Sequence, residues 1–212
     1  MADKTTLEAV KKALEGSPQR KFKESVEIAI NLKDIDLSVP KNRIAEDVIL
    51  PKGRGRDVKV AIFCGGELAR KSKEVADMVI TPEQIDEFAG DKKKTKKLAS
   101  QTTYFLAEAP LMPLIGKKLG QILATRGKMP RPIPPGADPT QVVTNLRKTV
   151  SVKSKDRKTF HAPVGTRDMN PEDIAENVDL ILKRVIGRLE RGKMNISSVY
   201  LKTTMGPAVR LM

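Results

Sequence analysis

The residues best suited to binding chemistry lie near the carboxyl end of the chain, between positions 197 and 210. Val199–Leu201 favours a strand, and Gly206–Pro207 ends it, because Pro donates no hydrogen bond and Gly adopts backbone shapes that other residues avoid. The turn offers the hydroxyls of Thr203–Thr204, the soft apolar tip of Met205 and bare backbone at Gly206. These groups suit close approach to a sugar-phosphate backbone, where 2′-hydroxyls need small donors and acceptors. An ordinary strand end with a Gly-Pro turn is the simpler interpretation of these residues alone.

Residues for catalysis or metal binding are scarce. One His (His161) and one Cys (Cys64) cannot form a Cys/His zinc cluster, and a single Cys excludes an internal disulfide. No strand is followed by a Gly-rich loop that ends in Lys-Ser or Lys-Thr. Gly65-Gly66 lacks the G-x-G-x-x-G spacing of a dinucleotide site, so it predicts a plain tight turn. We therefore predict no catalytic residue, no metal site and no cofactor.

The charge balance points to a polyanionic partner. The 212 residues include 40 Lys and Arg against 26 Asp and Glu, a formal net charge of +14. Aromatic residues make up 3% of the chain, which supplies few platforms for base stacking. No apolar run is long enough to cross a membrane, the amino terminus has no signal-peptide pattern, and the lone Cys fits a reducing cytosol. We expect a cytoplasmic protein with no membrane partner.

The elements that must position the carboxyl-terminal turn begin at the other end of the chain. Thr5 and Glu8 predict a capping box for an amphipathic helix over 5–15. Apolar residues alternate over 22–32, which predicts a half-buried strand that starts at Phe22. The basic loop 51–56 follows a second short strand. The sequence allows three interpretations of this loop: a phosphate contact, a hinge or a solvated loop.

The middle of the chain has a different pattern. Residues 58–64 are almost continuously apolar, as is typical of a strand covered on both faces. Short strands at 78–80 and 104–107 alternate with helices, which indicates a parallel α/β unit with right-handed crossovers. One further helix is expected through Leu114–Leu123.

Two runs in the middle segment have unusual compositions. Lys92–Lys97 contains five lysines, for which a solvated surface is the ordinary interpretation and a non-specific phosphate contact the second. Its role stays open. Pro130–Pro135 predicts a stiff extended loop.

The segments on either side of the middle block must bury their apolar faces against each other. After a helix over 138–148 and a strand over 149–152, the pattern predicts a long helix from Pro171 that ends at Gly192, then the final strand. We predict a discontinuous α+β domain from 1–57 and 149–212, with an inserted doubly wound, Rossmann-like α/β domain at 58–148. The insert carries 16 basic and 9 acidic residues, leaving 24 and 17 outside it, so both domains could face RNA.

Four motifs follow one another across nearly the whole chain: Lys21–Glu27, Gly116–Gly120 with Arg126–Pro130, His161–Gly165 and Lys202–Pro207. In that order they resemble the first strand, the central signature, a late loop and the carboxyl-terminal signature of the L-one family, that of the first protein of the large ribosomal subunit. The run at 130–135 resembles the archaeal branch. Ala124-Thr125 departs from the Gly-Pro that the family usually has there.

The resemblance implies a two-domain ribosomal protein of the cytoplasmic ribosome and not an enzyme. It implies that the discontinuous domain binds large-subunit rRNA at the mobile stalk, and a mimic of that site on the protein's own operon mRNA, whose translation it would repress. It also implies help in releasing deacylated tRNA from the exit site. Off the ribosome we expect a monomer.

The resemblance carries the family's RNA-binding positions onto Lys21, Phe22, Glu27, Ser198, Thr204, Met205 and Gly206. Lys21 would neutralise a phosphate. Phe22 would pack on a sugar or base, unless it is a core residue. Glu27 would accept from 2′-hydroxyl or base amino groups, unless it forms a salt bridge with a neighbouring lysine.

The carboxyl-terminal members of this set would supply three kinds of contact. Ser198 and Thr204 would offer hydroxyls, and Met205 an adaptable apolar surface. Gly206 would let the RNA backbone approach without meeting a Cβ.

Two other classes of function stay open at this point. One is a nucleotide-dependent enzyme built on 58–148, which the missing phosphate loop and the lack of clustered catalytic residues oppose. The other is a free regulatory RNA-binding protein that never joins a ribosome. Nucleotide calorimetry tests the first, and co-sedimentation with large subunits tests the second.

Overall fold

The computed structural model describes residues 3–134 and 138–212. The chain divides into two compact units, one formed by Met1–Arg56 with Lys148–Met212 and the other by Asp57–Arg147. We call them the flanking unit and the inserted unit. Each has its own hydrophobic core. One contains antiparallel sheets and the other a parallel sheet with helices, which confirms the predicted fold class.

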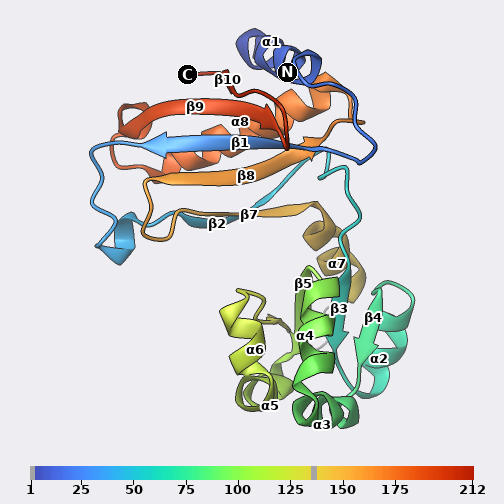
Figure 1. The fold of residues 1–212 in the computed structure, drawn as a ribbon. Coiled ribbons are helices and arrows are strands. Elements are labelled where there is room, and N and C mark those ends of the chain that lie inside the picture. Colours follow the sequence, from blue (N-terminus) through green and yellow to red (C-terminus); the bar gives the residue numbers. More distant parts are fainter. Residues whose placement is uncertain (1–2, 135–137) are drawn as a thin grey trace. The chain divides into compact units, whose positions relative to one another are not determined.

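The flanking unit is built on a four-stranded antiparallel sheet in the order β10-β9-β1-β8, with a two-stranded sheet of β2 and β7 beside it (Figure 1). Its elements are α1 (Lys4–Glu15), β1 (Ser25–Leu32), η1 (Pro40–Asn42), β2 (Ala45–Ile49), β7 (Thr149–Lys153), β8 (Thr159–Thr166), α8 (Pro171–Arg188), η3 (Gly192–Asn195), β9 (Ile196–Thr203) and β10 (Val209–Arg210).

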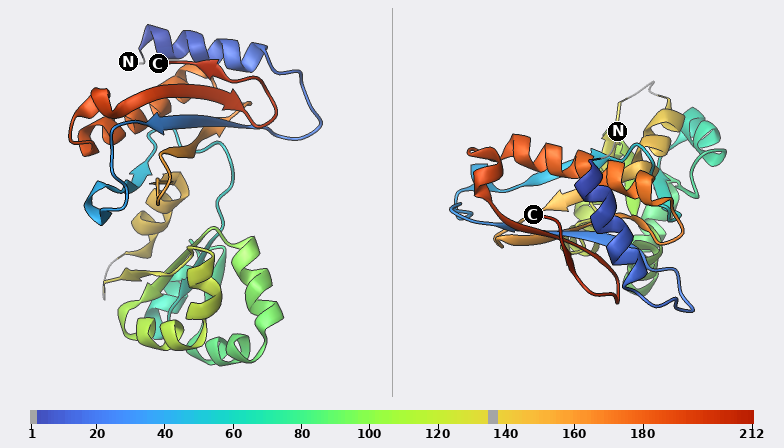
Figure 2. Two further views of the ribbon diagram at one scale, coloured as in Figure 1. Left: turned by 60° about the vertical axis from the view of Figure 1, so that its left-hand side comes forward. Right: turned by 90° about the horizontal axis from the view of Figure 1, so that it is seen from above.

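Strand β1 lies at the centre of this sheet and separates a core face from an outer face. Val26, Ile28 and Ile30 are fully buried, whereas Glu27 and Asn31 are partly exposed. The core face packs against α1 and α8, which also contact each other (Figures 1 and 2). The predicted long helix is confirmed, but it ends at Arg188 rather than Gly192, which begins η3.

Two boundaries predicted for this sheet are wrong. Strand β1 begins at Ser25, so Lys21 and Phe22 lie in the preceding loop, and Phe22 is 51% exposed. The segment His161–Gly165, interpreted as a loop, lies within β8. An edge strand tolerates Pro163 because one side of it needs no ladder hydrogen bond, and the β1–β8 register shifts by one residue opposite it.

The amino terminus of α1 is capped through tertiary contacts rather than by the predicted Thr5–Glu8 box. The helix begins at Lys4, with Asp3 at the cap position and no side-chain cap of its own. The Asp179 carboxylate of α8 instead accepts from Asp3 N at 2.8 Å and from Thr6 Oγ1 at 2.7 Å. A carboxylate there satisfies a free donor and complements the helix dipole.

The basic loop 51–56 is held against α8. The side chain of buried Asn177 accepts from Lys52 N at 3.4 Å and donates to Gly53 O at 2.9 Å. Lys52 Nζ lies 3.2 Å from the Asp173 carboxylate, and the hydrogen bond and charge of Asp173 raise the pKa of Lys52. Lys52 is therefore occupied by acidic partners, which disfavours a phosphate contact at this residue.

The inserted unit is a parallel sheet in the order β4-β3-β5-β6 with helices on both faces (Figure 2). One face packs against α3 to α6 and the other against α2 and α7. Its elements are β3 (Val60–Phe63), α2 (Gly66–Lys73), β4 (Met78–Ile80), α3 (Pro82–Gly90), α4 (Lys92–Gln101), β5 (Tyr104–Glu108), η2 (Ala109–Leu111), α5 (Met112–Lys118), α6 (Gly120–Thr125), β6 (Arg131–Ile133) and α7 (Pro139–Lys148).

Two predictions for the inserted unit need correction. Arg131–Ile133, expected to be a loop, forms the edge strand β6, where Pro132 is tolerated; Pro135 lies outside the described residues. The single helix expected through Leu114–Leu123 is two helices, α5 and α6, which meet at Leu119. The all-buried strand β3 is confirmed.

Some features are absent from the described part of the chain. No helix in residues 3–134 and 138–212 has the length and apolar character needed to span a membrane. Within the same residues, no group of three or more His, Cys, Asp or Glu side chains is arranged to hold a metal ion.

Candidate nucleic-acid interface

The two strands that carry the sequence-predicted residues are hydrogen-bonded neighbours. In the β1–β9 register, Glu27 lies opposite Lys202 and Asn31 lies opposite Ser198. Directly opposed residues of an antiparallel pair point to the same face. Because the alternate residues of both strands are in the core, Glu27 and Ser198 share the outer face of the sheet.

Polar side chains cross this outer face from strand to strand. Asn31 Nδ2 donates to Ser198 Oγ at 2.8 Å, and Thr159 Oγ1 on β8 donates to Asn31 Oδ1 at 2.8 Å. The Ser198 hydroxyl accepts in this contact, so its own hydrogen remains available to a ligand. Asn31 and Thr159 were not among the predicted residues. Asn31 could have been found, because it is one of the residues that alternate with the apolar ones in the predicted strand.

Glu27 presents an open carboxylate on the outer face. It is partly exposed, and within residues 3–134 and 138–212 it forms no ion pair, so the alternative salt bridge to a neighbouring lysine is not found. Its two oxygens can accept hydrogen bonds from hydroxyl or amino groups. Lys202 opposite Glu27 limits the repulsion that a lone carboxylate would exert on a phosphate.

The turn Thr203–Gly206, which we call the signature turn, is fastened to the start of β1. Thr204 Oγ1 accepts from Ser25 N at 3.1 Å and donates to Ser25 O at 3.2 Å, and Thr204 N also donates to that carbonyl at 3.0 Å. The Thr204 hydroxyl is thus committed to the protein backbone. These bonds indicate that the Thr204 hydroxyl shapes the turn and is not a free donor for a ligand.

Glu24 is a residue that sequence reasoning missed, and it ties the two ends of the chain together. Its side chain is buried, and its carboxylate accepts from Ser17 Oγ at 3.1 Å, Arg167 Nη1 at 3.0 Å and Met205 N at 3.3 Å. Arg20 Nε lies 3.5 Å away. We call these residues the Glu24 cluster. The only sequence signal was an acid four residues after Arg20 within a basic run.

The Glu24 cluster holds its carboxylate in the charged form. Burial alone would raise the pKa of Glu24, but hydrogen bonds from Ser17, Arg167 and Met205 N, with the charge of Arg20, outweigh it and lower the pKa below its ordinary value. The ionised carboxylate keeps the signature turn against the loop 17–24.

Two large apolar side chains are exposed on these joined segments. Phe22 is 51% exposed and Met205 is 60% exposed. The alternative interpretation of Phe22 as a core residue is therefore wrong. Lys21 is also exposed, whereas Lys23 pairs with Asp168 at 3.2 Å. An aromatic ring, a thioether and an ammonium group are thus exposed just before β1 and just after β9. Groups of these kinds can contact bases or sugars and phosphates.

Gly206 is needed by the protein itself. A Cβ at this position would collide with Thr203 Oγ1 and would lie 3.0 Å from Ser17 Cβ. Its Cα therefore packs inside the turn, against the same Ser17 that donates to Glu24. Close packing within the protein is a sufficient reason for Gly here, independent of any RNA.

In the described part of the inserted unit, a contact within the protein occupies a backbone donor at the point where this fold would place a nucleotide. Ligands of doubly wound sheets bind at the carboxyl ends of strands where the strand order reverses, here between β3 and β5. Gly65 N, the donor at that point, is bound by the Glu108 carboxylate at 3.3 Å. Cys64 beside it is buried, and its burial raises the pKa of its thiol, with the Glu108 charge adding to the effect.

The basic residues of the central signature stabilise the end of α4. Arg126 Nη1 donates to Lys96 O at 3.1 Å and to Ser100 Oγ at 2.6 Å. Lys128 Nζ donates to Ala99 O at 2.7 Å and to a second carbonyl at 2.6 Å, and its burial lowers its pKa. Cations near a helix carboxyl terminus satisfy carbonyls that lack partners.

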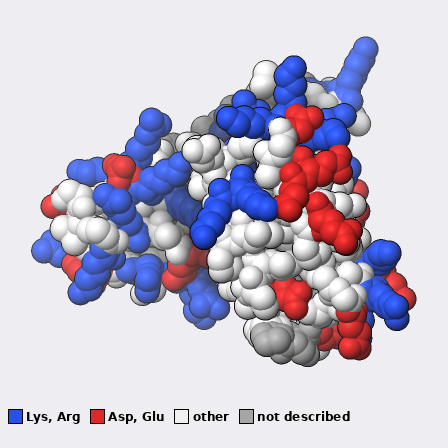
Figure 3. Space-filling view, turned by 90° about the horizontal axis from the view of Figure 1, so that it is seen from below, with Lys and Arg blue, Asp and Glu red and all other residues white. Residues whose placement is uncertain are grey.

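Basic groups are not confined to one patch. Figure 3 shows Lys and Arg side chains spread across the face that it presents, with Asp and Glu among them. Charge scattered in this way can supply only sequence-independent attraction to a polyanion.

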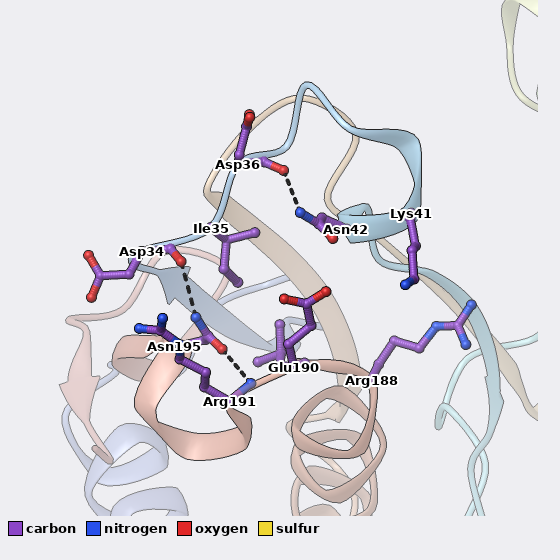
Figure 4. Close-up of a pocket in the computed structure, with 10 residues that line it drawn as sticks. Asp34, Ile35, Asp36, Lys41, Asn42, Arg188, Glu190, Arg191 and Asn195 are labelled. Carbon is purple, nitrogen blue, oxygen red and sulfur yellow. Dashed lines mark hydrogen bonds between the residues drawn. The ribbon is translucent and has the colours of Figure 1, made fainter.

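A separate pocket of about 250 Å³ lies between the loop after β1 and the end of α8 (Figure 4). Several of its polar groups are paired within the protein. Asn195 donates to Asp34 O at 3.3 Å and accepts from Arg191 N at 2.8 Å, and Asn42 donates to Asp36 O at 3.0 Å. These bonds hold the loop between Asp34 and Asn42 in place.

Comparison with known proteins places this geometry in a family context. The model of the family described as "Ribosomal protein L1p/L10e family" matches residues 10–207. The chain is 55% identical over 213 residues to the large ribosomal subunit protein uL1 of Methanocella arvoryzae, covering 100% of both chains. It is 56% identical over 203 residues to that of Thermoplasma acidophilum, covering 96% of this chain and 94% of the relative. Identity to that of Haloferax volcanii is 46% over 211 residues, covering 100% and 99%.

Proposed function

The chain belongs to the ribosomal protein L1p/L10e family, and we propose that it is a structural constituent of the large ribosomal subunit that binds rRNA through its flanking unit. The observation that carries the proposal is the joining of the two chain ends. Pairing of β1 with β9 puts Glu27 and Ser198 on one face of the sheet, and the bond from Met205 N to Glu24 fastens the signature turn beside the start of β1. Both observations support the proposal. Membership of a ribosomal-protein family also favours a structural role over the enzyme alternative.

The proposed contacts divide by chemistry. Lys21 neutralises a phosphate, and Phe22 and Met205 pack against sugars or unstacked bases. Glu27 accepts hydrogen bonds from 2′-hydroxyl or base amino groups, and Ser198 donates one. Specificity resides in the polar and apolar contacts, since phosphate binding alone carries no sequence information.

Thr204 and Gly206 act differently from the other five residues in this proposal. Thr204 binds Ser25, and Gly206 packs against Ser17, so both set the shape of the signature turn. Met205 is presented to RNA by a turn that its neighbours hold rigid.

We extend the proposal to the place and further partners of the protein. The rRNA segment lies at the mobile stalk beside the tRNA exit site, the protein assists release of deacylated tRNA, and it represses translation of its own operon mRNA through the same surface. Support comes from the motifs that resemble the family and from the net charge of +14. The protein is a monomer off the ribosome. Competition of the operon leader with the rRNA segment for a single site tests the repression, and co-sedimentation with large subunits excludes or supports a free regulator.

Removing either exposed apolar contact should weaken specific binding. Phe22→Ala and Met205→Ala are each expected to lower affinity for the large-subunit rRNA segment by about tenfold or more, as at an interface hot spot. Both side chains are exposed, so melting temperatures should change little. Met194→Ala is the matched control, because Met194 is 74% exposed on η3 of the same unit. Affinities equal to the control, measured at one salt concentration, would contradict the proposed surface.

Removing the inserted unit should leave specific rRNA binding intact. Leu50 N donates to Lys148 O at 3.0 Å, and Ile49 pairs with Thr149, so the segments that lead to and from the inserted unit are neighbours and a short Gly-Ser linker can replace 57–147. The flanking unit keeps its own core. We expect circular dichroism of a folded α+β protein and near-parental specific affinity by filter binding. A folded protein without specific affinity would place the principal site on the inserted unit.

A further inference from the structure

Helix α4 of the inserted unit carries lysines where a helix tolerates them least. Lys92, Lys93, Lys94, Lys96 and Lys97 occupy its first two turns, and the helix has no acidic residue in its first turn. The amino end of a helix is the positive end of its dipole, so cations there are unfavourable. Asp91 offsets part of this, accepting from Lys93 N at 2.8 Å and Lys94 N at 3.2 Å. Helix stability therefore gives no reason for this run.

The lysines divide into paired and unpaired members. Lys94 binds Glu87 of α3 at 2.7 Å. The acid next to Glu87, Asp86, is occupied by Lys118. Lys92, Lys93, Lys96 and Lys97 are exposed and form no ion pair within the described residues.

Three of the unpaired lysines, Lys93, Lys96 and Lys97, form one face that continues beyond α4. Thr95, Leu98 and Ala99 are buried, so the opposite side of the helix presents Lys93 and Lys97, spaced about 6 Å along the axis. The exposed Arg126 guanidinium, bound to Lys96 O and Ser100 Oγ, extends this face at the carboxyl end of the helix. We call Lys93, Lys96, Lys97 and Arg126 the α4 basic face.

We propose that the α4 basic face is a second RNA-binding surface, which contacts the phosphate backbone without reading sequence. The α4 run has no aromatic residue for stacking on bases, and four cations with no acid among them match a row of phosphates. RNA is chosen over other polyanions because this inference rests on the proposed ribosomal function. It adds a distinct site on the unit that lacks the signature turn.

The test uses the full chain and an RNA duplex unrelated in sequence to rRNA. In the variant Lys93→Gln/Lys96→Gln/Lys97→Gln, the plot of log affinity against log salt should become shallower by about 2 to 3, close to one per lost phosphate contact. The control Lys4→Gln/Lys11→Gln/Lys12→Gln removes the same charge from exposed positions on α1, and its slope should change by less than about 1. Lys93→Arg/Lys96→Arg/Lys97→Arg keeps the charges and should retain the parental slope.

Stability separates a binding role from a structural one. The Gln variant should melt at or above the parental temperature, because it removes cations from the positive end of the helix dipole. The inference would be overturned if the Gln variant and the α1 control had equal slopes of log affinity against log salt. It would also be overturned if the Gln variant failed to fold and the Arg variant had a reduced slope. Phosphatidylserine-containing vesicles form a further arm: loss of vesicle binding with an unchanged RNA slope would assign the face to a membrane. Specific rRNA affinity, measured in parallel, reports on the flanking unit, so failure of the proposed function is recognised separately.

Discussion

Replacing Glu24 with Ala is expected to cause a large loss of stability, as is seen when one partner of a buried ion pair is removed, together with a loss of specific rRNA binding. The change removes the acceptor shared by Ser17, Arg167 and Met205 N and leaves two arginines without their buried partner. The signature turn then loses its attachment to the loop 17–24. Thermal melting followed by circular dichroism and filter binding of the rRNA segment measure the two effects.

Two controls separate the network from the simple loss of a charge. Glu24→Gln keeps the size and one acceptor oxygen, so it should fall between the parent and Glu24→Ala. Glu8→Ala removes an exposed acid from α1 and should change melting very little. A Glu24→Ala variant that melts with the parent and binds rRNA equally well would show that the cluster does not position the turn.

The pH dependence of the same variants gives an independent check with a defined sign. The pKa of Glu24 in the folded protein lies below its ordinary value of about 4.5, so its charged form stabilises the fold at higher pH. That contribution is lost as the pH falls below about 4.5 and through the folded-state pKa. The melting difference between parent and Glu24→Gln should therefore be constant near neutral pH and shrink on acidification. A difference that grows as the pH falls would have the wrong sign for this network.

Gly206→Val is expected to damage both folding and RNA binding. The added side chain meets Thr203 Oγ1 and Ser17 Cβ, and relieving overpacking of this kind costs about 1 to 3 kcal/mol. The displaced turn would carry Met205 away from its position, so specific affinity should fall by about tenfold or more. Urea unfolding and rRNA binding at one salt concentration measure the two losses.

The matched control for this substitution is Gly187→Ala in α8, where no atom lies within 4 Å of the new Cβ. It should be neutral or stabilising by about 0.4 to 1 kcal/mol, because Ala restricts the unfolded chain. A Gly206→Val variant with parental stability but weak RNA binding would show that RNA itself occupies the space beside Gly206. Parental values for both properties would refute both roles.

The sequence by itself determined the elements whose pattern is local. Alternation of Val26, Ile28 and Ile30 with polar residues predicts β1, and the all-apolar run 58–64 predicts a strand covered on both faces, as β3 is. The charge and the scarcity of Cys, His and aromatic residues pointed to a polyanion partner and away from metal chemistry. Such properties depend on a residue and its near neighbours, so they can be read from order alone.

Only the tertiary structure decided which polar residues act together. Glu24 looks like one more charge in a basic loop, until folding brings Arg167, 143 positions away, and Met205, 181 positions away, to its carboxylate. Pro163 opposes a strand in isolation and is tolerated because β8 is an edge. The sequence suggests that an RNA backbone can approach Gly206 closely, but in the folded protein Ser17 fills the space beside this residue. In each case the deciding partner is distant in the chain, and its contribution exists only after the backbone has folded around it.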